Sequence, residues 1–444
     1  MKVLIENYGC ELNASEMNAL MLSLDEAHID YTTDIKDNSI DAVVINTCSV
    51  RGSAEERVLG RIAHWNGLKK TNPKFGIFIT GCMAERLGEE LYKRFKRIDK
   101  VVLNNDKMLL PFYLEALKNG KYEFNGEHNE VYKFAKYYSK EGDLNAYVPI
   151  MNGCNNFCTY CIVPYVRGRE ISRNDEDIIA ELKRIDSFKT TPVVTLLGQN
   201  VNSYKYDNGK SVVNFSELVK KIDSIKFKHI KSIRFESPHP KDFSDELIEI
   251  LRKTKHFSHH FHIPIQSGNS RILEMMNRRY TREEALELFN KIRKAMPDST
   301  FSLDLMVGFP SETKAEFNDT LRFVKEVGPL DAFMYYWNKR EGTAAEKIIN
   351  GVISEEQRKD RLEILIAFER ANAAHLKQNR IGMVRKVCVK GPSRNNKDEV
   401  LAFDIDTLES VVFKSHKAKK GDVVKVKLQE LVGNTYKAKV HYLF

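Results

Sequence analysis

The chain has 444 residues, which is more than one hydrophobic core usually supports, so we expect two or three domains. Hydrophobic residues make up 42% and charged residues 30%, a balance that is typical of globular proteins and excludes an intrinsically disordered chain. Seventy lysines and arginines against 61 acidic residues give a net charge of +9, which weakly favours a polyanionic partner.

The sequence shows no signal peptide at its first residues and no run of about 18 apolar residues that could span a membrane. We therefore expect a cytoplasmic protein without a membrane partner. In that reducing compartment, the seven cysteines are better explained by metal binding or catalysis than by a disulfide framework.

Three strand-then-helix units open the chain and predict a parallel sheet covered by helices. Short β-rich runs occupy residues 2–8, 41–46 and 76–80, and a helical apolar period follows the first of them over residues 15–24. Residues 119–143 are polar without a clear period, and we interpret them as an interdomain linker. An N-terminal domain over residues 1–118 follows from this division.

Strand and helix signals then alternate six times and predict a central domain over residues 144–380. The predicted strands are 147–151, 193–197, 232–236, 260–263, 301–307 and 332–337, and residues 357–379 form one long amphipathic helix. Six βα units indicate an open, partial (βα)6 barrel. In such folds the chemistry collects at the carboxyl ends of the strands.

The tail over residues 381–444 has a different sequence pattern, in which valines alternate with polar and basic residues. Five short strands are predicted at 383–389, 400–403, 409–413, 423–428 and 436–441, which indicates a small antiparallel β-barrel. The tail holds 13 lysines and arginines and 7 acidic residues, so +6 of the net charge lies there. The chain as a whole is predicted to be an α/β protein.

Three cysteines with the spacing CxxxCxxC, Cys154, Cys158 and Cys161, come directly after the strand predicted at 147–151. Three thiolates can hold three irons of a 4Fe-4S cluster, and the fourth iron stays open to bind and reduce a ligand. A closed structural zinc site normally takes four protein ligands, and no fourth Cys or His completes this local set. The motif therefore predicts an iron-sulfur cluster with an open iron.

Three further cysteines, Cys10, Cys48 and Cys82, each lie just past a predicted N-terminal strand. The carboxyl ends of parallel strands lie side by side, so these thiols can converge and hold a second cluster. Their wide spacing leaves unrelated buried cysteines as an equal alternative. We assign no cluster to Cys388, which lies in a predicted strand of the tail.

The CxxxCxxC motif after the first strand of a partial βα barrel resembles the radical S-adenosylmethionine (SAM) superfamily. With the second cysteine triad and the basic tail, essentially the whole chain is similar to the methylthiotransferase family, whose members end in a TRAM domain. Within that family, segments 152–170 and 197–204 resemble the MiaB branch, the tRNA-2-methylthio-N6-dimethylallyladenosine synthases.

The resemblance implies methylthiolation of C2 of N6-isopentenyladenosine next to the anticodon of tRNA, with two 4Fe-4S clusters and SAM as cofactors. The auxiliary cluster on Cys10, Cys48 and Cys82 would carry a sulfur atom that one SAM methylates. A second SAM, cleaved at the Cys154 triad, would supply the radical that activates the adenine. An electron donor and a sulfur source of unknown identity are the further partners implied.

Other activities stay open at this point. Related branches methylthiolate threonylcarbamoyl-adenosine in tRNA or an aspartate of a ribosomal protein, and a non-enzymatic iron-sulfur RNA-binding protein is the alternative from a different class. The chain also departs from the branch pattern at Glu11-Leu12 and at Trp337-Asn338-Lys339, which puts its fine substrate preference in doubt.

Candidates for SAM binding follow from the superfamily pattern and from the predicted strand ends. An aromatic residue between the cluster cysteines usually contacts the adenine, and a Gly-Gly-Glu segment often binds the amino group where this chain has Gly-Gln-Asn. Polar side chains at the later strand ends would reach the ribose or the carboxylate, and a glycine would admit the adenine edge. Each is singly more often a packing, loop or cap residue. The candidates are Phe157, Gly198, Gln199, Asn200, Ser237, Gln266, Asp304 and Gly308.

Candidates for RNA binding are basic residues in two places. Arginines after the cysteine motif would clamp phosphates or stack beside the target base, unless they pair with Glu170 and the acidic run 175–181. Lysines between two strands of the tail suit a small barrel that grips the RNA backbone, with a solvated surface as the alternative. These residues are Arg167, Arg169, Arg173, Lys414, Lys417, Lys419 and Lys420.

Overall fold

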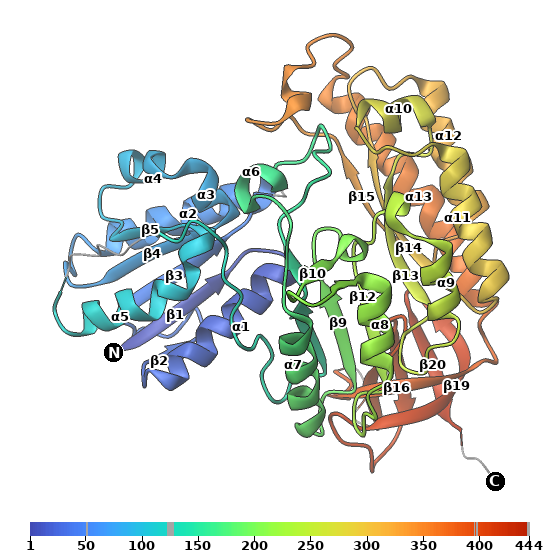
Figure 1. Ribbon diagram of the computed structural model, residues 1–444, viewed down its shortest axis with the longest axis horizontal. Helices are drawn as coiled ribbons and strands as arrows, with labels where there is room; N and C mark the ends of the chain where they lie inside the picture. Colours follow the sequence, from blue (N-terminus) through green and yellow to red (C-terminus); the bar gives the residue numbers. More distant parts are fainter. Residues whose placement is uncertain (50–51, 122–127, 395, 397, 442–444) are drawn as a thin grey trace. The chain divides into compact units, whose positions relative to one another are not determined.

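The computed structural model describes residues 1–49, 52–121, 128–394, 396 and 398–441 (Figure 1). The chain divides into two compact units. Unit 1 comprises residues 1–140, 147–155 and 161–173, and unit 2 comprises residues 141–146, 156–160 and 174–444. The CxxxCxxC motif therefore passes from unit 1 into unit 2 and back.

A five-stranded parallel sheet forms the centre of unit 1, with the order β2-β1-β3-β4-β5. Strands β3 and β4 are buried along their whole length, which explains why their sequences are almost continuously apolar. The strands are β1 (Lys2–Asn7), β2 (Asp30–Thr32), β3 (Ala42–Thr47), β4 (Gly76–Gly81) and β5 (Lys100–Val102).

Helices cover both faces of this sheet, because successive side chains of a strand point to opposite sides. Val3 and Ile5 of β1 pack with α1 and α5, whereas Leu4 packs with α2, α3 and α4. The helices are α1 (Glu11–Glu26), α2 (Gly52–Leu68), α3 (Cys82–Leu87), α4 (Glu89–Arg94), α5 (Leu110–Lys118) and α6 (Val163–Arg167), with the 3-10 helix η1 (Asn104–Leu109). The two-stranded pair β7 (Met151–Asn152) and β8 (Ile171–Ser172) completes the unit.

The segment that we interpreted as a linker contributes to the core of unit 1 in its described part. Tyr132, Ala135 and Tyr138 are buried, and the last two pack against Ala19 of α1. Residues 128–140 therefore belong to unit 1. Their aromatic side chains gave no periodic signal, because the segment forms neither a helix nor a strand.

Two three-stranded sheets, β12-β9-β6 and β13-β14-β15, form the first half of unit 2. Parallel bridges between residues 233 and 257 and between residues 236 and 262 continue the strand order from β12 to β13. The strands are β6 (Asn145–Pro149), which starts in unit 2, β9 (Val193–Leu197), β12 (Ser232–Phe235), β13 (His260–Gln266), β14 (Thr300–Val307) and β15 (Asp331–Tyr336). The open six-strand arrangement predicted from the sequence is thereby confirmed.

The helices of this half lie between the strands in sequence, and several begin at capping boxes. Asn214, Thr281 and Thr313 each accept from the backbone N–H of a glutamate three residues on, whose side chain accepts in return from the N-cap N–H. The helices are α7 (Asp175–Ser187), α8 (Phe215–Asp223), α9 (Asp245–Leu251), α10 (Ser270–Met275), α11 (Arg282–Ala295), α12 (Lys314–Val327) and α13 (Glu355–Gln378), with η2 (Val201–Ser203), η3 (Pro240–Asp242), η4 (Ala344–Lys347) and the hairpin β10 (Lys205–Asp207) and β11 (Val212–Asn214).

A closed five-stranded barrel ends the chain, with the order β16-β17-β18-β20-β19. Four pairings are antiparallel as predicted, but β18 and β20 pair in parallel. Strand directions cannot alternate around a closed ring with an odd number of strands, so at least one parallel pair is required. The strands are β16 (Val384–Pro392), β17 (Glu399–Asp404), β18 (Ser410–Lys414), β19 (Val423–Val432) and β20 (Thr435–Val440).

The barrel packs at the amino ends of the strands in the first half of unit 2 (Figure 1). Val193, the first residue of β9, lies in one apolar cluster with Cys388 and Phe403 of the barrel. Ser232, the first residue of β12, donates to Asp406 Oδ1 over 2.9 Å. The carboxyl ends of the same strands, where chemistry is expected, lie at the other end.

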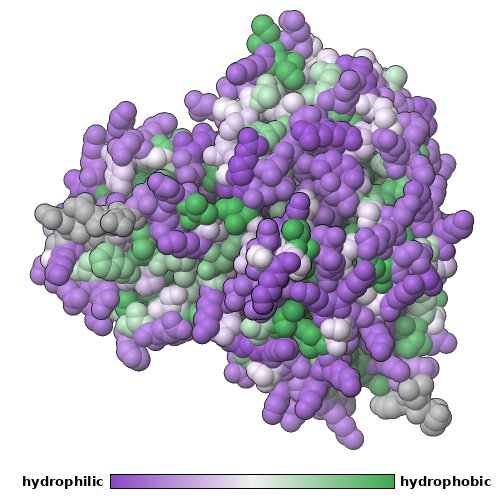
Figure 2. All heavy atoms as spheres, viewed as in Figure 1, coloured by the Kyte–Doolittle hydropathy of each residue, from purple (hydrophilic) through white to green (hydrophobic). Residues whose placement is uncertain are grey.

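The molecular face in Figure 2 is mostly hydrophilic, in keeping with a chain in which 30% of the residues are charged. Across the part of the chain that the structure describes, every helix is too short or too polar to cross a bilayer.

Candidate cluster and cofactor sites

The first cysteine triad lies at the carboxyl edge of the parallel sheet in unit 1. Cys10 is the N-cap of α1 and follows β1, and Cys82 begins α3 directly after β4. Cys48 follows β3, which lies between β1 and β4 in the sheet. Burial raises the pKa of the Cys10 thiol, Arg167 lowers it, and the Cys82 and Cys48 thiols raise it further.

Asn13 connects the loops that carry these cysteines. Its Oδ1 accepts from Cys10 Sγ over 3.4 Å and from Arg167 Nη2 over 2.8 Å. Its Nδ2 donates to the carbonyl of Thr47, next to Cys48, over 3.0 Å. Gly81, next to Cys82, has φ +96°, and a Cβ there would collide with the Thr47 carbonyl oxygen. The triad is therefore held by a fixed backbone frame.

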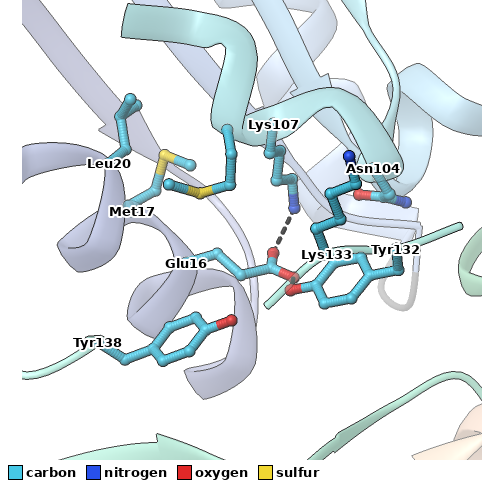
Figure 3. A pocket seen from close by; sticks show the side chains of 9 residues that line it. Glu16, Met17, Leu20, Asn104, Lys107, Tyr132, Lys133 and Tyr138 are labelled. Atoms are coloured by element: carbon cyan, nitrogen blue, oxygen red, sulfur yellow. Dashed lines mark hydrogen bonds and ion pairs between the residues drawn. The ribbon is translucent and has the colours of Figure 1, made fainter. Parts of the chain in front are cut away.

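Arg167 and Lys107 share one buried carboxylate, Glu16 of α1. Figure 3 shows the ion pair of Glu16 with Lys107. Arg167 Nη1 donates to Glu16 Oε1 over 2.8 Å, and the Tyr132 hydroxyl donates to the same oxygen over 3.1 Å. Burial opposes the charge of Glu16, but Arg167 and Lys107 outweigh it and lower its pKa to about 2. The carboxylate lines a small pocket between α1, η1 and the segment around Tyr132.

The structure corrects the RNA-binding prediction for Arg167 and Arg173. Arg167 is 6% exposed and its guanidinium is taken up by Glu16, Asn13 and Asn152. Arg173 is 1% exposed and donates to backbone carbonyls of Pro149 and Lys136. A buried guanidinium that is already bonded cannot clamp a phosphate. Arg169 is exposed and stays a candidate.

The second triad begins at Cys154, which is buried like Cys158, whereas Cys161 is half-buried. In unit 1, Gly153 has φ +80° and a Cβ there would collide with the carbonyl group of Arg169, so this position requires glycine. The Cys154 N–H donates to the carbonyl of Gly168 over 3.1 Å. The backbone on either side of the motif is thus fixed.

Within unit 2, the turn after α10 holds the middle of the motif. Asn277 Nδ2 donates to the carbonyls of Asn156 and Phe157 over 3.1 and 3.0 Å, and the Thr159 N–H donates to the carbonyl of Met276 over 3.1 Å. Arg278 Nη1 donates to Cys158 Sγ over 3.4 Å. Sequence reasoning missed these contacts, because about 120 residues separate the two segments and neither carries a local sign of the other.

The chemistry of both triads fits an iron-sulfur cluster, because each offers three soft sulfur donors from a fixed backbone. Within the described ranges, no three His, Cys, Asp or Glu side chains stand close enough to ligate a single metal ion. The ligands of a cluster bind different irons and stand further apart than the ligands of one ion. This finding therefore bears on single-ion sites only.

Six of the predicted SAM residues lie at the carboxyl ends of β9, β12, β13 and β14, whereas Asp304, which we expected near a strand end, lies in the middle of β14, and Phe157 lies between the cluster cysteines. Gln199 follows β9 beside Gly198, and its buried Oε1 has no hydrogen-bond partner among the residues that the structure describes. A free amide oxygen of this kind fits the ammonium group of a methionyl moiety. The next strand ends carry Ser237, Gln266 and Gly308 with φ +61°, +78° and +71°. This conformation is strained for the non-glycine residues Ser237 and Gln266, and strained residues gather at ligand sites.

Three other SAM candidates, Asn200, Asp304 and Phe157, differ in their burial and in their hydrogen-bond partners. Asn200 is 1% exposed, and its amide donates to Asp242 Oδ2 over 2.7 Å, so it holds the η3 turn instead of facing a ligand. Asp304 pairs with His262 over 3.0 Å, and although burial lowers the pKa of this imidazole, Asp304 outweighs it and raises the pKa. Phe157 is half-buried with φ +47°.

The four tail lysines are all exposed on the barrel. Lys414 ends β18, and the other three lie in the loop before β19. This loop lies in the part of unit 2 that packs on the amino ends of the βα strands. The lysines are therefore free to meet a phosphate backbone without entering the cluster region. They are Lys414, Lys417, Lys419 and Lys420.

Two family profiles match the chain. Residues 148–324 match the radical SAM superfamily, and residues 2–103 match a family described as uncharacterized protein family UPF0004. The structure is also similar to the radical SAM methyltransferase TsrM from Kitasatospora setae, with a TM-score of 0.55 over 75% of this chain and 72% of that one. At 13% identity this likeness shows the fold alone.

Curated relatives are similar over nearly the whole length. A protein of Treponema denticola is 38% identical over 99% of this chain and 100% of its own length. A protein of Fusobacterium nucleatum is 38% identical over 97% of both chains. Both relatives are named tRNA-2-methylthio-N(6)-dimethylallyladenosine synthase.

Proposed function

Because the chain belongs to the family of tRNA-2-methylthio-N(6)-dimethylallyladenosine synthases, we propose that it methylthiolates C2 of N6-isopentenyladenosine next to the anticodon of tRNA. The observation that carries this proposal is full-length similarity to these enzymes in a chain with two three-cysteine sites, one at the carboxyl edge of the N-terminal sheet and one after β6, the first strand of the βα half-barrel. The enzyme is a radical SAM tRNA methylthiotransferase.

Two 4Fe-4S clusters and SAM, when bound, supply the radical and the methylthio group. Cys154, Cys158 and Cys161 hold the radical SAM cluster, and Cys10, Cys48 and Cys82 hold the auxiliary one. Asn13 and Gly81 fix the loops of the auxiliary triad. Gln199 accepts from the amino group of SAM, and Ser237, Gln266 and Gly308 shape the rest of its pocket.

The partners follow from the substrate. We place the tRNA backbone on the exposed lysines of the barrel, because phosphate contacts by lysine fix orientation without reading sequence. An electron donor and a sulfur source must serve the two clusters, and we place the reaction in the cytoplasm with its tRNA.

The test is mass spectrometry of tRNA nucleosides from cells that lack the gene and from cells complemented with variants. We expect the methylthio group on isopentenyladenosine to disappear and to return with the wild-type chain. Cys154→Ala should not restore it, and neither should the Cys10, Cys48, Cys82 triple alanine variant. Cys388→Ala is the matched control, because this cysteine lies in the apolar cluster between the barrel and β9, and it should restore the product. An unchanged nucleoside in the deletion cells contradicts the proposal.

A second experiment tests the barrel. Reversing Lys414, Lys417, Lys419 and Lys420 to Glu should weaken tRNA binding about tenfold or more and flatten its salt dependence. The matched control reverses four exposed lysines on or beside the outer helices, namely Lys253, Lys294, Lys314 and Lys325. Equal affinities and salt slopes for the two variants would move the RNA site away from the barrel.

A further inference from the structure

A short turn after α10 contacts the cysteine motif through backbone and side chain together. Thr159 Oγ1 donates to the carbonyl of Met275 over 2.9 Å, and Asn277 donates to two carbonyls on the other side of Cys158. Asn277 and Arg279 have φ +59° and +60°. Non-glycine residues rarely adopt this conformation, and it persists only where the surroundings impose it. The two strained residues flank Arg278 and fix its place.

Arg278 is 4% exposed and brings a full positive charge into the interior of unit 2. Its Nη1 donates to Cys158 Sγ, its Nε to the Tyr280 hydroxyl over 3.1 Å, and its Nη2 to the carbonyl of Pro264 over 2.5 Å. None of these partners is a carboxylate, and in the described chain Arg278 enters no ion pair with Asp or Glu. Its charge therefore has no counter-charge among the side chains it touches.

A buried cation without a counter-charge is unfavourable, and such charges are found paired. Thiolates on a bound cluster are the negative groups that this position offers. Hydrogen bonds to the sulfurs and the net charge nearby both set the reduction potential of a cluster. Reduction adds one electron and makes the cluster one unit more negative, so a buried cation beside it stabilises the reduced form.

We propose that Arg278 is a positioning residue of the cluster on Cys154, Cys158 and Cys161, which holds Cys158 by an N–H···S hydrogen bond and raises the reduction potential of the cluster. The inference rests on the proposed function of this triad and deepens it. Arg278 therefore makes the cluster easier for the electron donor to reduce, and this role requires no contact between Arg278 and the tRNA.

The next residue supplies the control. Arg279 carries the same charge one position further on, but it is exposed, so its charge is screened by water. Arg278→Gln and Arg279→Gln each remove one positive charge. Both variants are made in the same background, the full-length Cys10, Cys48, Cys82 triple alanine variant. In that background the Cys154 triad is the single predicted cluster site, so the measured reduction potential belongs to its cluster. Iron is counted, and the potential is measured by a dithionite titration followed by EPR, without SAM or tRNA.

We expect Arg278→Gln to reduce the ratio of reduced to oxidised cluster at a fixed potential at least tenfold, which is about 59 mV for a one-electron couple. Arg279→Gln should change the ratio less than twofold. Arg278→Lys keeps the charge and loses the planar fork, so its potential should lie between those of wild type and Arg278→Gln.

Equal potentials for Arg278→Gln and Arg279→Gln, with equal iron, overturn the inference. If Arg278→Gln loses its iron while Arg279→Gln keeps it, the holding role is supported, and the potential is then read on Arg278→Lys. A potential of Arg278→Lys equal to that of Arg279→Lys overturns the contribution of the N–H···S hydrogen bond to the potential, because both variants keep the charge. Failure of the parent triple variant to bind iron overturns the proposed function of the Cys154 triad, and the inference with it.

Discussion

Unit 1 and unit 2 each bury one arginine beside a cysteine triad, but they compensate its charge differently. Arg167 in unit 1 is bidentate to Glu16, with Nη1···Oε1 at 2.8 Å and Nη2···Oε2 at 3.2 Å. Arg278 in unit 2 touches a hydroxyl, a carbonyl and a thiol. Glu16 therefore balances the charge of Arg167 before any cluster binds. The charge of Arg278 gains a counter-charge only when the cluster binds. In cluster-free protein, removal of the counter-charge of Arg167 should therefore lower the unfolding free energy of unit 1, whereas removal of the Arg278 charge should leave that of unit 2 unchanged or raise it.

The two tryptophans of the chain allow this comparison to be measured in one molecule. Trp65 is buried in unit 1 and Trp337 in unit 2, with 5% and 3% exposed. Fluorescence of the Trp337→Phe variant reports unfolding of unit 1, and fluorescence of the Trp65→Phe variant reports unfolding of unit 2. All the following experiments use these two full-length backgrounds without clusters.

The largest effect is expected from Glu16→Ala. Removal of the carboxylate leaves the positive charges of Arg167 and Lys107 buried without a counter-charge. Breaking a buried ion pair in this way costs about 3–5 kcal/mol of folding free energy. We expect the unfolding free energy of unit 1, measured in urea through Trp65, to fall by that amount. Glu26→Ala is the control, because Glu26 is exposed near the end of the same helix. Similar losses in both variants would show that the ion pair contributes no more than a surface charge.

Acid should remove nearly as much stability from unit 1. The pKa of Glu16 is lowered from 4.5 in the unfolded chain to about 2 in the folded one by Arg167 and Lys107, against the opposing effect of burial. A depressed pKa stabilises the fold above the unfolded value, and this part, about 3 kcal/mol, is lost as pH falls from about 4.5 through about 2. Urea unfolding through Trp65 at pH 7 and pH 3 should show a larger drop for wild type than for Glu16→Gln. Parallel curves would mean that Glu16 does not cause the acid dependence.

A smaller effect is expected from Tyr132→Phe. This change removes the hydroxyl that donates to Glu16 Oε1, and a hydrogen bond to a charged group contributes about 1.5–3 kcal/mol. The loss should shrink in the Glu16→Ala background, because the two residues then no longer interact. Tyr165→Phe, at an exposed position of unit 1, is the control and should be close to neutral. Additive losses of Tyr132→Phe and Glu16→Ala would contradict the shared network.

The strands were accessible to sequence reasoning because their signals are local. The prediction of 193–197 coincides with β9, and the five barrel strands fall within a few residues of their predicted places. The three-residue edge strands β2 and β5 were not predicted, since so few residues carry no period. The parallel β18-β20 pair follows from closure of the whole ring, which no single segment records.

The sites divide in the same way. Strand ends and cysteines are visible in the sequence, so all six candidate cluster ligands could be named from it. The inward turn of Arg167 was not visible, because its partner Glu16 lies 151 residues away. An arginine in sequence is read as a surface charge unless its counter-charge is nearby. Arg167, Arg173 and Arg278 are all buried, and each has at least one partner more than 20 residues away.

Arg278→Met should give the smallest effect, and it tests the comparison most directly. Without a cluster, Arg278 is a buried cation whose desolvation no carboxylate offsets, so an apolar side chain of similar length should be tolerated within about 1 kcal/mol or should stabilise unit 2. The substitution also removes the hydrogen bonds that Arg278 donates to the Pro264 carbonyl and the Tyr280 hydroxyl. The loss of these two bonds opposes the gain. Unfolding followed through Trp337 gives the value, with Arg279→Met as the exposed control. A loss of 3 kcal/mol or more, as expected for Glu16→Ala, would show that Arg278 already has its counter-charge in the cluster-free chain. The two units would then not differ.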